Sequence, residues 1–569
     1  MKIPYGESNF KTVISGGYVY VDKTATINQL EEAGKYLFLL RPRRFGKSLF
    51  LSMLEYYYDV AYRDEFDTLF GRLAIGQNPT PLRNSYQVLF MDFSGIDTDE
   101  GHDTILQRIN EKLDSHLQHF LRRYAYPETF QREVLAKTSP AAKMQHFWDV
   151  MSGQKLLLLI DEYDHFANSI LAADMKLFLR VMGKGGFVRS FYETLKTATQ
   201  RGTLDRLFVT GVTPIMLDSM TSGFNIGQNL SLHEGFNEAI GFTKTEVSGL
   251  LQPLADSCPV ALEQLLADVT RWYNGYRFNI KSPETVYNAN MVLYFVKNFD
   301  LRRCAYPKPM MDENIASDYG KIMGMFSIGN RDENFAVLDE LINQGTVQAS
   351  QRRKFEFDKG FDRDDFISLL AYMGFVTLQN ETLSGETFVI PNYAIREFYF
   401  HYFKVELERR NQISIPNQAL RLAVEKLALY ADIQPLMDEM VRALQLLSNR
   451  DAMGMDEKHV KVLLLTLLYQ TQIYFVQSER ELNRRYPDIL LLERNPIAVP
   501  HQHLIELKYS KKSDKDAGWA AKKQEGIEQV QGYLQLPEIA ALQNLVAWLL
   551  VTDGERVEVV NFSFPEGNA

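Results

Sequence analysis

The segment that most constrains the fold is an apolar run at 36–40, YLFLL, followed by a basic turn and then by a helical pattern. The run lacks polar–apolar alternation, which is typical of a parallel strand covered on both faces. Similar apolar runs recur between helical patterns, with strands expected at 88–95, 155–164 and 206–214 and helices at 104–124 and 191–202. Strands that alternate with helices predict an α/β domain with a doubly wound parallel sheet.

The turn after the first run has the sequence RPRRFGKS and lies where a phosphate-binding loop, GxxxxGK[ST], joins a strand to a helix. Arg41 replaces the first glycine of that pattern. Gly46 would let the backbone approach a phosphate, Lys47 would reach the β- and γ-phosphates, and Ser48 would ligate Mg²⁺. Arg44 would add positive potential near a triphosphate. For the GKS tripeptide alone, a basic surface turn is the better interpretation.

The strand expected at 155–164 supplies a second half for such a site, because it ends in Asp161-Glu162. Asp161 would orient Mg²⁺ and its water, and Glu162 would polarise the attacking water. The basic turn and the acidic strand end occur in the order that a P-loop NTPase requires. Together they favour a Mg²⁺-dependent ATP site over two unrelated surface features.

Polar residues near the fourth expected strand are weaker candidates. Thr210 and Thr213 would sense the γ-phosphate if they lie at the cavity, although a threonine at a strand end usually caps a turn. Arg201 and Arg206 are candidate arginine fingers, with a solvated arginine as the alternative for each.

Four motifs, RPRRFGKSL, LLLIDEYD, VTGVTP and WYNGYRF (272–278), together with VDKT at 21–24, resemble the bacterial AAA-ATPase-like family over about residues 1–300. The resemblance implies a P-loop ATPase related to the STAND and archaeal ATPase branch. It places ATP and Mg²⁺ at the glycine–lysine–serine turn and the acidic strand end, and it puts Tyr20 and Asp22 beside the nucleotide.

Composition limits the cellular setting. The net charge of −10 does not favour nucleic-acid binding by the whole surface, although a local basic face is compatible with it. Cys258 and Cys304 are the two cysteines, too few for a disulfide scaffold, and they fit a reducing cytoplasm. The apolar run 460–476 is interrupted by Lys461 and two glutamines, which predicts a buried helix and a strand instead of a membrane span. We therefore expect a cytoplasmic protein.

The character of the sequence changes three times along the chain. It becomes mostly helical from 241, shows a helix followed by a short hairpin at 361–400 that suits a winged-helix-like module, and returns to α/β after 471. These changes predict four regions: a P-loop domain at 1–240, a helical lid or linker at 241–360, a winged-helix-like and helical region at 361–470, and a final α/β domain at 471–569.

The last region contains a carboxylate–lysine pattern in 486–509, where two apolar strands are joined by a turn. Asp488 lies near the start of the first strand. Glu506 and Lys508 lie two apart on the second and hence on one face. Metal-dependent phosphodiester cleavage needs carboxylates on Mg²⁺ or Mn²⁺ and a lysine near the reacting phosphate. A solvated strand face with a Glu–Lys pair is an equally good interpretation of these three residues alone.

Glu481, upstream of the pattern, and Gln529 and Tyr533 on the following helix strengthen the nuclease interpretation. With them the segment resembles the PD-(D/E)XK nuclease superfamily over about 471–569, although 480–488, RELNRRYPD, lacks the glycines of the related REsGxGRxD pattern. The resemblance implies a restriction-endonuclease-like α/β fold, a metal held by Glu481, Asp488 and Glu506, and DNA as substrate. A basic patch for the DNA backbone is one interpretation of Lys511, Lys512, Lys515, Lys522 and Lys523, which Arg484 and Arg485 would extend, although a charged helix surface explains most such runs.

The sequence thus predicts an ATPase coupled to a nuclease-like domain. One alternative is a STAND-like nucleotide-controlled switch whose nuclease-like domain only binds a partner. Another is an ATP-driven DNA motor, which the lack of a helicase motif disfavours. The sequence does not indicate an oligomeric state.

Overall fold

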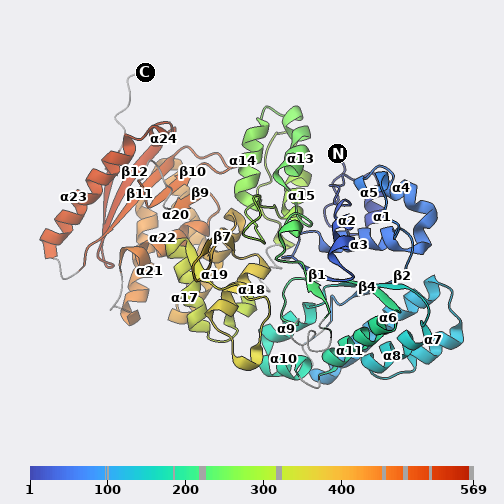
Figure 1. Ribbon diagram of the computed structural model, residues 1–569. Coiled ribbons are helices and arrows are strands. Elements are labelled where there is room, and N and C mark those ends of the chain that lie inside the picture. The colour runs from blue at the N-terminus through green and yellow to red at the C-terminus, as the bar shows by residue number, and fades with distance from the viewer. Residues whose placement is uncertain are drawn as a thin grey trace. The chain divides into compact units, whose positions relative to one another are not determined.

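The computed structural model describes residues 1–569 except 97, 99–100, 184–185, 217–223, 225, 315–322, 452–455, 479–484, 512–514 and 563–569. The chain divides into two compact units, which are Met1–Cys304 with Met310–Ala394, and Ala305–Pro309 with Ile395–Ala569. Figure 1 colours the chain from blue at the N-terminus to red at the C-terminus. The four regions expected from the sequence stay a prediction.

A five-stranded parallel sheet organises the first unit (Figure 1). Its strands are β1 (Tyr36–Leu40), β2 (Gln87–Asp92), β3 (Leu156–Asp161), β4 (Leu204–Gly211) and β5 (Gln228–Asn229). The order is β2-β3-β4-β1-β5, and every neighbouring pair is parallel. Every residue of β3 is buried, as expected for a strand covered on both faces. The predicted parallel α/β sheet and its four predicted strands are confirmed.

Helices surround this sheet: α1 (Phe10–Ser15), α2 (Thr26–Ala33), α3 (Lys47–Tyr58), α4 (Phe66–Phe70), α5 (Ala74–Gln77), α6 (His102–Arg123), α7 (Glu128–Leu135), α8 (Pro140–Val150), α9 (His165–Ala173), α10 (Met175–Met182) and α11 (Phe187–Gln200). Helix α3 packs against β2, β3 and β4, whereas α6 contacts β2 and α11 contacts β4. Short 3-10 helices occur at Val60–Glu65, Glu234–Phe236, Met323–Ser327 and Phe357–Lys359.

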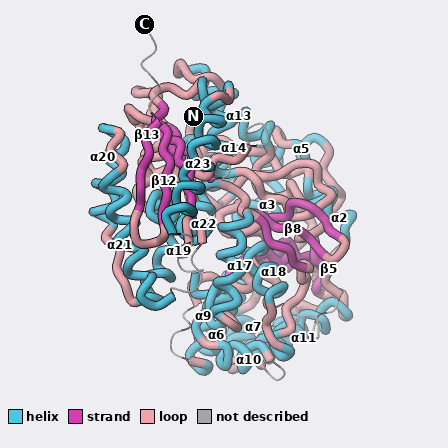
Figure 2. The backbone as a smooth tube through the Cα atoms, turned by 90° about the vertical axis from the view of Figure 1, so that its left-hand side faces the viewer, coloured by secondary structure: helices cyan, strands magenta, loops and turns pink. Residues whose placement is uncertain are grey.

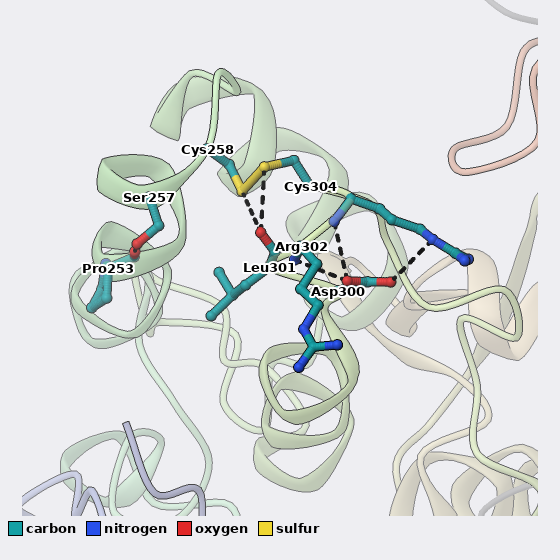
Figure 3. The surroundings of a disulfide bond; sticks show 8 residues. Pro253, Ser257, Cys258, Asp300, Leu301, Arg302 and Cys304 are labelled. Carbon is teal, nitrogen blue, oxygen red and sulfur yellow. Dashed lines mark hydrogen bonds and ion pairs between the residues drawn. A yellow bond between two sulfur atoms is a disulfide. The ribbon is translucent and has the colours of Figure 1, made fainter.

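Three helices follow the sheet: α13 (Lys244–Ser257), α14 (Leu262–Tyr273) and α15 (Ala289–Asn298), which pack on one another. A disulfide joins Cys258, directly after α13, to Cys304, in the loop after α15, with a Cα–Cα distance of 5.5 Å. The carbonyl oxygen of Leu301 lies 3.9 and 3.8 Å from the two sulfurs (Figure 3). The expectation of two reduced cysteines is therefore corrected: partners 46 residues apart in sequence meet only through the packing of these helices.

A small antiparallel sheet completes the first unit. It contains β6 (Thr346–Ala349), β7 (Thr377–Thr382) and β8 (Gly385–Val389) in the order β6-β8-β7, beside α17 (Arg331–Gln344) and α18 (Arg363–Met373). The predicted helix and hairpin are confirmed as α18 followed by β7 and β8, and β6 is an additional strand. Gly374 has φ 82°, and a Cβ there would lie 2.9 Å from the side chain of Pro42. The module therefore packs closely against the basic turn.

The second unit is built on a mixed sheet of β9 (Phe475–Ser478), β10 (Ile489–Leu492), β11 (Gln502–Tyr509), β12 (Leu545–Thr552) and β13 (Val557–Phe562). The order is β13-β12-β11-β10-β9, with β11 and β12 parallel and the other pairs antiparallel. The helices are α19 (Tyr393–Asn411), α20 (Asn417–Tyr430), α21 (Gln434–Asp451), α22 (Glu457–Tyr469), α23 (Lys515–Leu534) and α24 (Pro537–Ala540).

Helix α23 lies beside β12 (Figure 2) and also packs on β11, and α22 packs on β9 and β11. The run 460–476 forms most of α22 and the start of β9, so the predicted buried helix and strand are confirmed. Among the helices that the structure describes, none has the length and apolar character needed to cross a membrane.

Candidate functional site

The basic turn after β1 faces a cavity of about 780 Å³. The carboxyl ends of β1, β2 and β3 meet at one edge of the parallel sheet, where ligands bind in open α/β folds. The cavity lining includes residues from three of these strand ends: Lys47, Ser48, Asp92, Asp161 and Glu162. Ligand cavities in proteins commonly measure roughly 300–1,000 Å³, and this cavity lies within that range.

The backbone of the turn forms an anion-binding end of a helix. Gly46, with φ 104°, caps α3, which begins at Lys47. This left-handed conformation costs glycine little, whereas a side chain would strain it. The free N–H groups and the dipole of the first helical turn favour a phosphate there.

Lys47 and Ser48 face the acidic end of β3. The Lys47 side chain is buried; its Nζ donates to the Pro42 carbonyl at 3.2 Å and lies 3.9 Å from Glu162 Oε1. The Ser48 side chain is hydrogen-bonded to the Asp161 carboxylate. This serine and this carboxylate offer the oxygen ligands that Mg²⁺ prefers, so the side chains present fit that ion.

The Asp161 carboxyl is the most perturbed acid of this cavity. Burial raises its pKa to about 6, against the Ser48 hydrogen bond, and the neighbouring Glu162 carboxylate adds to the rise. Glu162 has φ 49°, an uncommon conformation for a residue with a side chain, and its N–H donates to Asp161 Oδ1 at 2.9 Å. Backbone strain of this kind concentrates at functional sites.

In the second unit, the antiparallel register places Asp488 opposite Glu506, because Ile489 pairs with Ile505. Directly opposed residues share one face of the sheet, and Lys508 lies two residues further on that face. The Leu507 N–H donates to Asp488 Oδ2 at 2.9 Å, and Lys508 Nζ donates to Glu506 Oε1 at 2.9 Å. The structure thus brings together the three residues singled out in the sequence.

Glu506 is only 2% exposed. Burial is the main reason why its pKa rises to about 7; the Asp488 carboxylate adds to this rise, and Lys508 opposes it. Tyr533 on α23 donates its hydroxyl to the Tyr486 carbonyl at 3.2 Å, and its pKa is raised by burial and by both carboxylates, so it lies beside the cluster. The Gln529 Oε1 atom is buried without a hydrogen-bond partner among the described residues.

Comparisons with known proteins identify the two regions of the chain in which these sites lie. Residues 4–221 match a family model described as predicted AAA-ATPase, and residues 455–562 match the PD-(D/E)XK nuclease superfamily. The chain joins an AAA-ATPase-like region to a PD-(D/E)XK nuclease superfamily region.

Two individual proteins are similar to parts of the chain. An uncharacterized protein in the vnfD 5′ region of Azotobacter chroococcum mcd 1 is 29% identical over 305 residues, which is 52% of this chain and 52% of that protein. The chain therefore spans about half the length of this curated relative. A solved Walker-type ATPase of Pyrococcus abyssi is 14% identical, with a TM-score of 0.38, and the likeness covers 67% of this chain and 96% of that one.

Arg41, at the first position of the loop in the AAA-ATPase-like region, has a structural position. It is 1% exposed, and its guanidinium donates to the carbonyls of Leu40, Ser231 and Phe236 at 2.8, 2.9 and 2.5 Å. It also lies 4.0 Å from the centre of the Phe278 ring. Arg41 therefore ties the loop to the segment after β5, whereas Arg43 and Arg44 line the cavity.

The structure does not favour the predicted sensor and arginine-finger roles. The Thr210 hydroxyl is fully buried and donates to the Leu39 carbonyl at 2.8 Å, and the Thr213 hydroxyl donates to Asp164 at 2.7 Å. Arg206 donates to the Gly34 carbonyl at 3.0 Å, and Arg201 is paired with Asp149. Among the described residues that line the cavity, none is one of these four.

The residues of the VDKT element and its neighbour have separate places. Tyr20 lines the cavity. The Asp22 carboxylate accepts the backbone N–H groups of Thr24 and Ala74 at 2.9 and 2.7 Å. Asp22 is therefore placed to hold the start of α5, and its expected place beside the nucleotide is not supported by these contacts.

Several cavity residues were not predicted from the sequence. Asp92 ends β2 directly opposite Asp161, and its carboxylate accepts the Ser94 hydroxyl at 2.7 Å. The apolar run that ends at Asp92 resembles the one that ends at Asp161, and this similarity was an available signal. Asn290, at the start of α15, donates its N–H to the Arg44 carbonyl at 3.1 Å. No local sequence pattern predicts the contact between Asn290 and Arg44.

The basic patch of the nuclease-like region stays a prediction. Lys522 pairs with Glu525 at 2.8 Å, and Lys523 pairs with Glu558 at 2.5 Å, so both lysines already have acidic partners. Arg485 donates to the Gly532 carbonyl at 2.5 Å. Glu481, Arg484 and Lys512 lie outside the described residues, as does the side chain of Lys515, while Lys511 is exposed. In the described part of the chain, no group of three or more His, Cys, Asp or Glu residues is placed to hold a metal ion.

The pKa of Asp161 yields a pH prediction. A cation needs the ionised carboxylate, and a raised pKa means that this group is protonated below about pH 6. The Mg²⁺-dependent part of ATP affinity should therefore fall as the pH decreases through that value. Calorimetry with a non-hydrolysable ATP analogue, with and without Mg²⁺, measures this part. Asp161→Asn should remove the Mg²⁺-dependent part of the ATP affinity, so that any remaining pH dependence comes from protonation of the nucleotide itself. A Mg²⁺-dependent affinity in the parent that stays constant or rises on acidification would contradict the prediction.

Proposed function

We propose that the AAA-ATPase-like region binds ATP with Mg²⁺ and hydrolyses it. The observation that carries this proposal is the convergence of Lys47 and Ser48 from one strand end with Asp161 and Glu162 from another on a single cavity. A buried lysine, a serine and two adjacent carboxylates beside a helix N-terminus are the groups that phosphoryl transfer to water requires.

Each side chain has a distinct task. The N–H groups after Gly46 bind phosphate oxygens, and Lys47 leaves the Pro42 carbonyl to reach the β- and γ-phosphates. Ser48 and Asp161 would hold Mg²⁺, which when bound neutralises charge on those phosphates. Glu162 orients the attacking water and accepts its proton.

Lys47→Ala should weaken ATP binding by roughly 10–100-fold, because a charge-assisted contact with phosphate contributes about 1.5–3 kcal/mol. Titration calorimetry with Mg²⁺ and a non-hydrolysable ATP analogue measures this change. Lys35→Ala is the matched control. Lys35 lies directly before β1, at the end of the strand away from the cavity, and pairs with Asp205. An unchanged affinity in Lys47→Ala would remove the phosphate assignment.

For the C-terminal region, the same proposal extends to metal-dependent cleavage of phosphodiester bonds in DNA. Its support is the opposed pair Asp488 and Glu506 with Lys508 on the same sheet face. Two carboxylates fit a divalent ion whose remaining ligands are water and phosphate, and Glu481 is proposed as a further ligand. Lys508 would steady the charge that develops on the phosphate.

The second candidate function is a nucleotide-controlled switch in which the nuclease-like region only binds a partner. The observation in its favour is that both carboxylates of the cluster, Asp488 and Glu506, already contact lysines. DNA incubated with the full chain and Mg²⁺ or Mn²⁺ separates the two functions. Cleavage supports the nuclease, and binding without cleavage supports the switch.

A further inference from the structure

Lys461 is a buried cation in the apolar part of helix α22. It lies in α22, where every residue from Val460 to Tyr469 is buried, and Lys461 itself is 7% exposed. An ammonium group in such surroundings is costly unless an anion accompanies it. The buried ammonium group of Lys461 therefore needs a counter-ion.

The counter-ion is the first carboxylate of the nuclease-like cluster. Lys461 Nζ lies 3.5 Å from Asp488 Oδ1, while Asp488 Oδ2 accepts the Leu507 N–H. Glu506 is arranged in the same way: its Oε2 faces the Asp488 N–H at 3.4 Å, and its Oε1 accepts Lys508 Nζ. Each carboxylate thus has one oxygen fixed by the opposite strand and one oxygen beside an ammonium.

We infer that Lys461 is a built-in counter-ion that competes with the divalent metal ion for Asp488 and so weakens metal binding. The inference rests on the proposed metal-dependent function of this cluster. The oxygen beside Lys461 is the one that the backbone leaves available to a cation. A metal ion that binds there must displace the ammonium or approach it against charge repulsion.

Helix α22 also supplies a place for the displaced ammonium. Glu457 precedes Lys461 by four residues, so the two side chains lie on one face of the helix. The Glu457 carboxylate accepts the Tyr509 N–H at 3.1 Å and lies 3.9 Å from Lys508 Nζ, which holds it beside the cluster. Lys461 can therefore exchange Asp488 for Glu457 when a metal ion binds.

The experiment measures Mn²⁺ binding to the full chain without nucleotide, by calorimetry and by the electron paramagnetic resonance of free Mn²⁺. Asp488→Asn identifies which binding event belongs to this cluster, because it should abolish that event alone. Lys461→Met should raise the Mn²⁺ affinity of this binding event roughly tenfold, since the substitution removes a positive charge next to a ligand oxygen. Lys461→Arg keeps the charge and should resemble the parent.

Lys458→Met is the matched control, because Lys458 is an exposed lysine on the first turn of the same helix. Circular dichroism and thermal melting establish that the variants fold, and Lys461→Gln replaces Lys461→Met if the latter does not. If the parent shows the Asp488-dependent binding event but the folded neutral variant binds Mn²⁺ with unchanged or weaker affinity, the inference is overturned. The proposed metal-dependent function would then still stand. Absence of that event in the parent would overturn the proposed metal-dependent function and the inference with it.

Discussion

Glu162→Gln should leave ATP affinity nearly unchanged and lower ATP turnover by ~10²–10⁴-fold, the usual loss when a general base is removed. The side-chain amide has nearly the same shape as the carboxylate but cannot accept a proton from water. Affinity should persist because Lys47, 3.9 Å from Glu162 Oε1, loses only a competing anion. The variant should therefore trap bound ATP.

Phosphate release under saturating ATP and Mg²⁺ measures the turnover, and calorimetry measures the affinity. Asp205→Asn is the control, since Asp205 lies on the neighbouring strand β4 and pairs with Lys35. Equal turnover in Glu162→Gln and the parent would show that Glu162 is structural. A parallel loss of affinity and turnover would instead assign Glu162 to nucleotide binding.

Asp488→Asn should reduce metal-dependent DNA cleavage more than ~100-fold, because even residues that only support metal ligands cost 10–100-fold when they are replaced. The asparagine side-chain oxygen can still accept the Leu507 N–H, which now bonds Asp488 Oδ2 at 2.9 Å. Glu457 on the same face of α22 remains as an anion for Lys461, so the fold should survive. The loss should then reflect the missing negative charge at the metal.

Cleavage of labelled DNA over a series of Mg²⁺ and Mn²⁺ concentrations tests this expectation. Asp553→Asn is the control in the same region, because Asp553 follows β12 and pairs with Arg556 at 3.1 Å. Cleavage that survives in Asp488→Asn, or that does not require metal, would remove the cluster from the reaction.

Local patterns in the sequence predicted much of this architecture. The strands β1 to β4 were predictable because each contains a run of consecutive apolar residues, which is typical of a strand covered on both faces. The carboxylate–lysine cluster was partly predictable, because side chains alternate along a strand and Glu506 and Lys508, two residues apart, must lie on one face. The pairing register that completes this cluster comes from the structure.

Features that depend on contacts between residues far apart in the chain could not be predicted from the sequence. The acceptors of the Arg41 guanidinium, Ser231 and Phe236, lie far along the chain, so the turn alone suggests a phosphate ligand. The disulfide between Cys258 and Cys304 likewise depends on how three helices pack. Thr210 ends a strand as a sensor would, but its hydroxyl donates to the neighbouring strand, and sequence spacing does not contain this information.

The central claim is that a nucleoside triphosphate occupies the cavity between the basic turn and the acidic end of β3. The most direct measurement is the electron density of the full chain crystallised with Mg²⁺ and a non-hydrolysable ATP analogue. We expect phosphate density against the N–H groups of residues 46–48, with a metal ion between Ser48 and Asp161 and with Lys47 turned from the Pro42 carbonyl to the phosphates. Bound analogue elsewhere on the chain, with this cavity still containing only solvent, would contradict it.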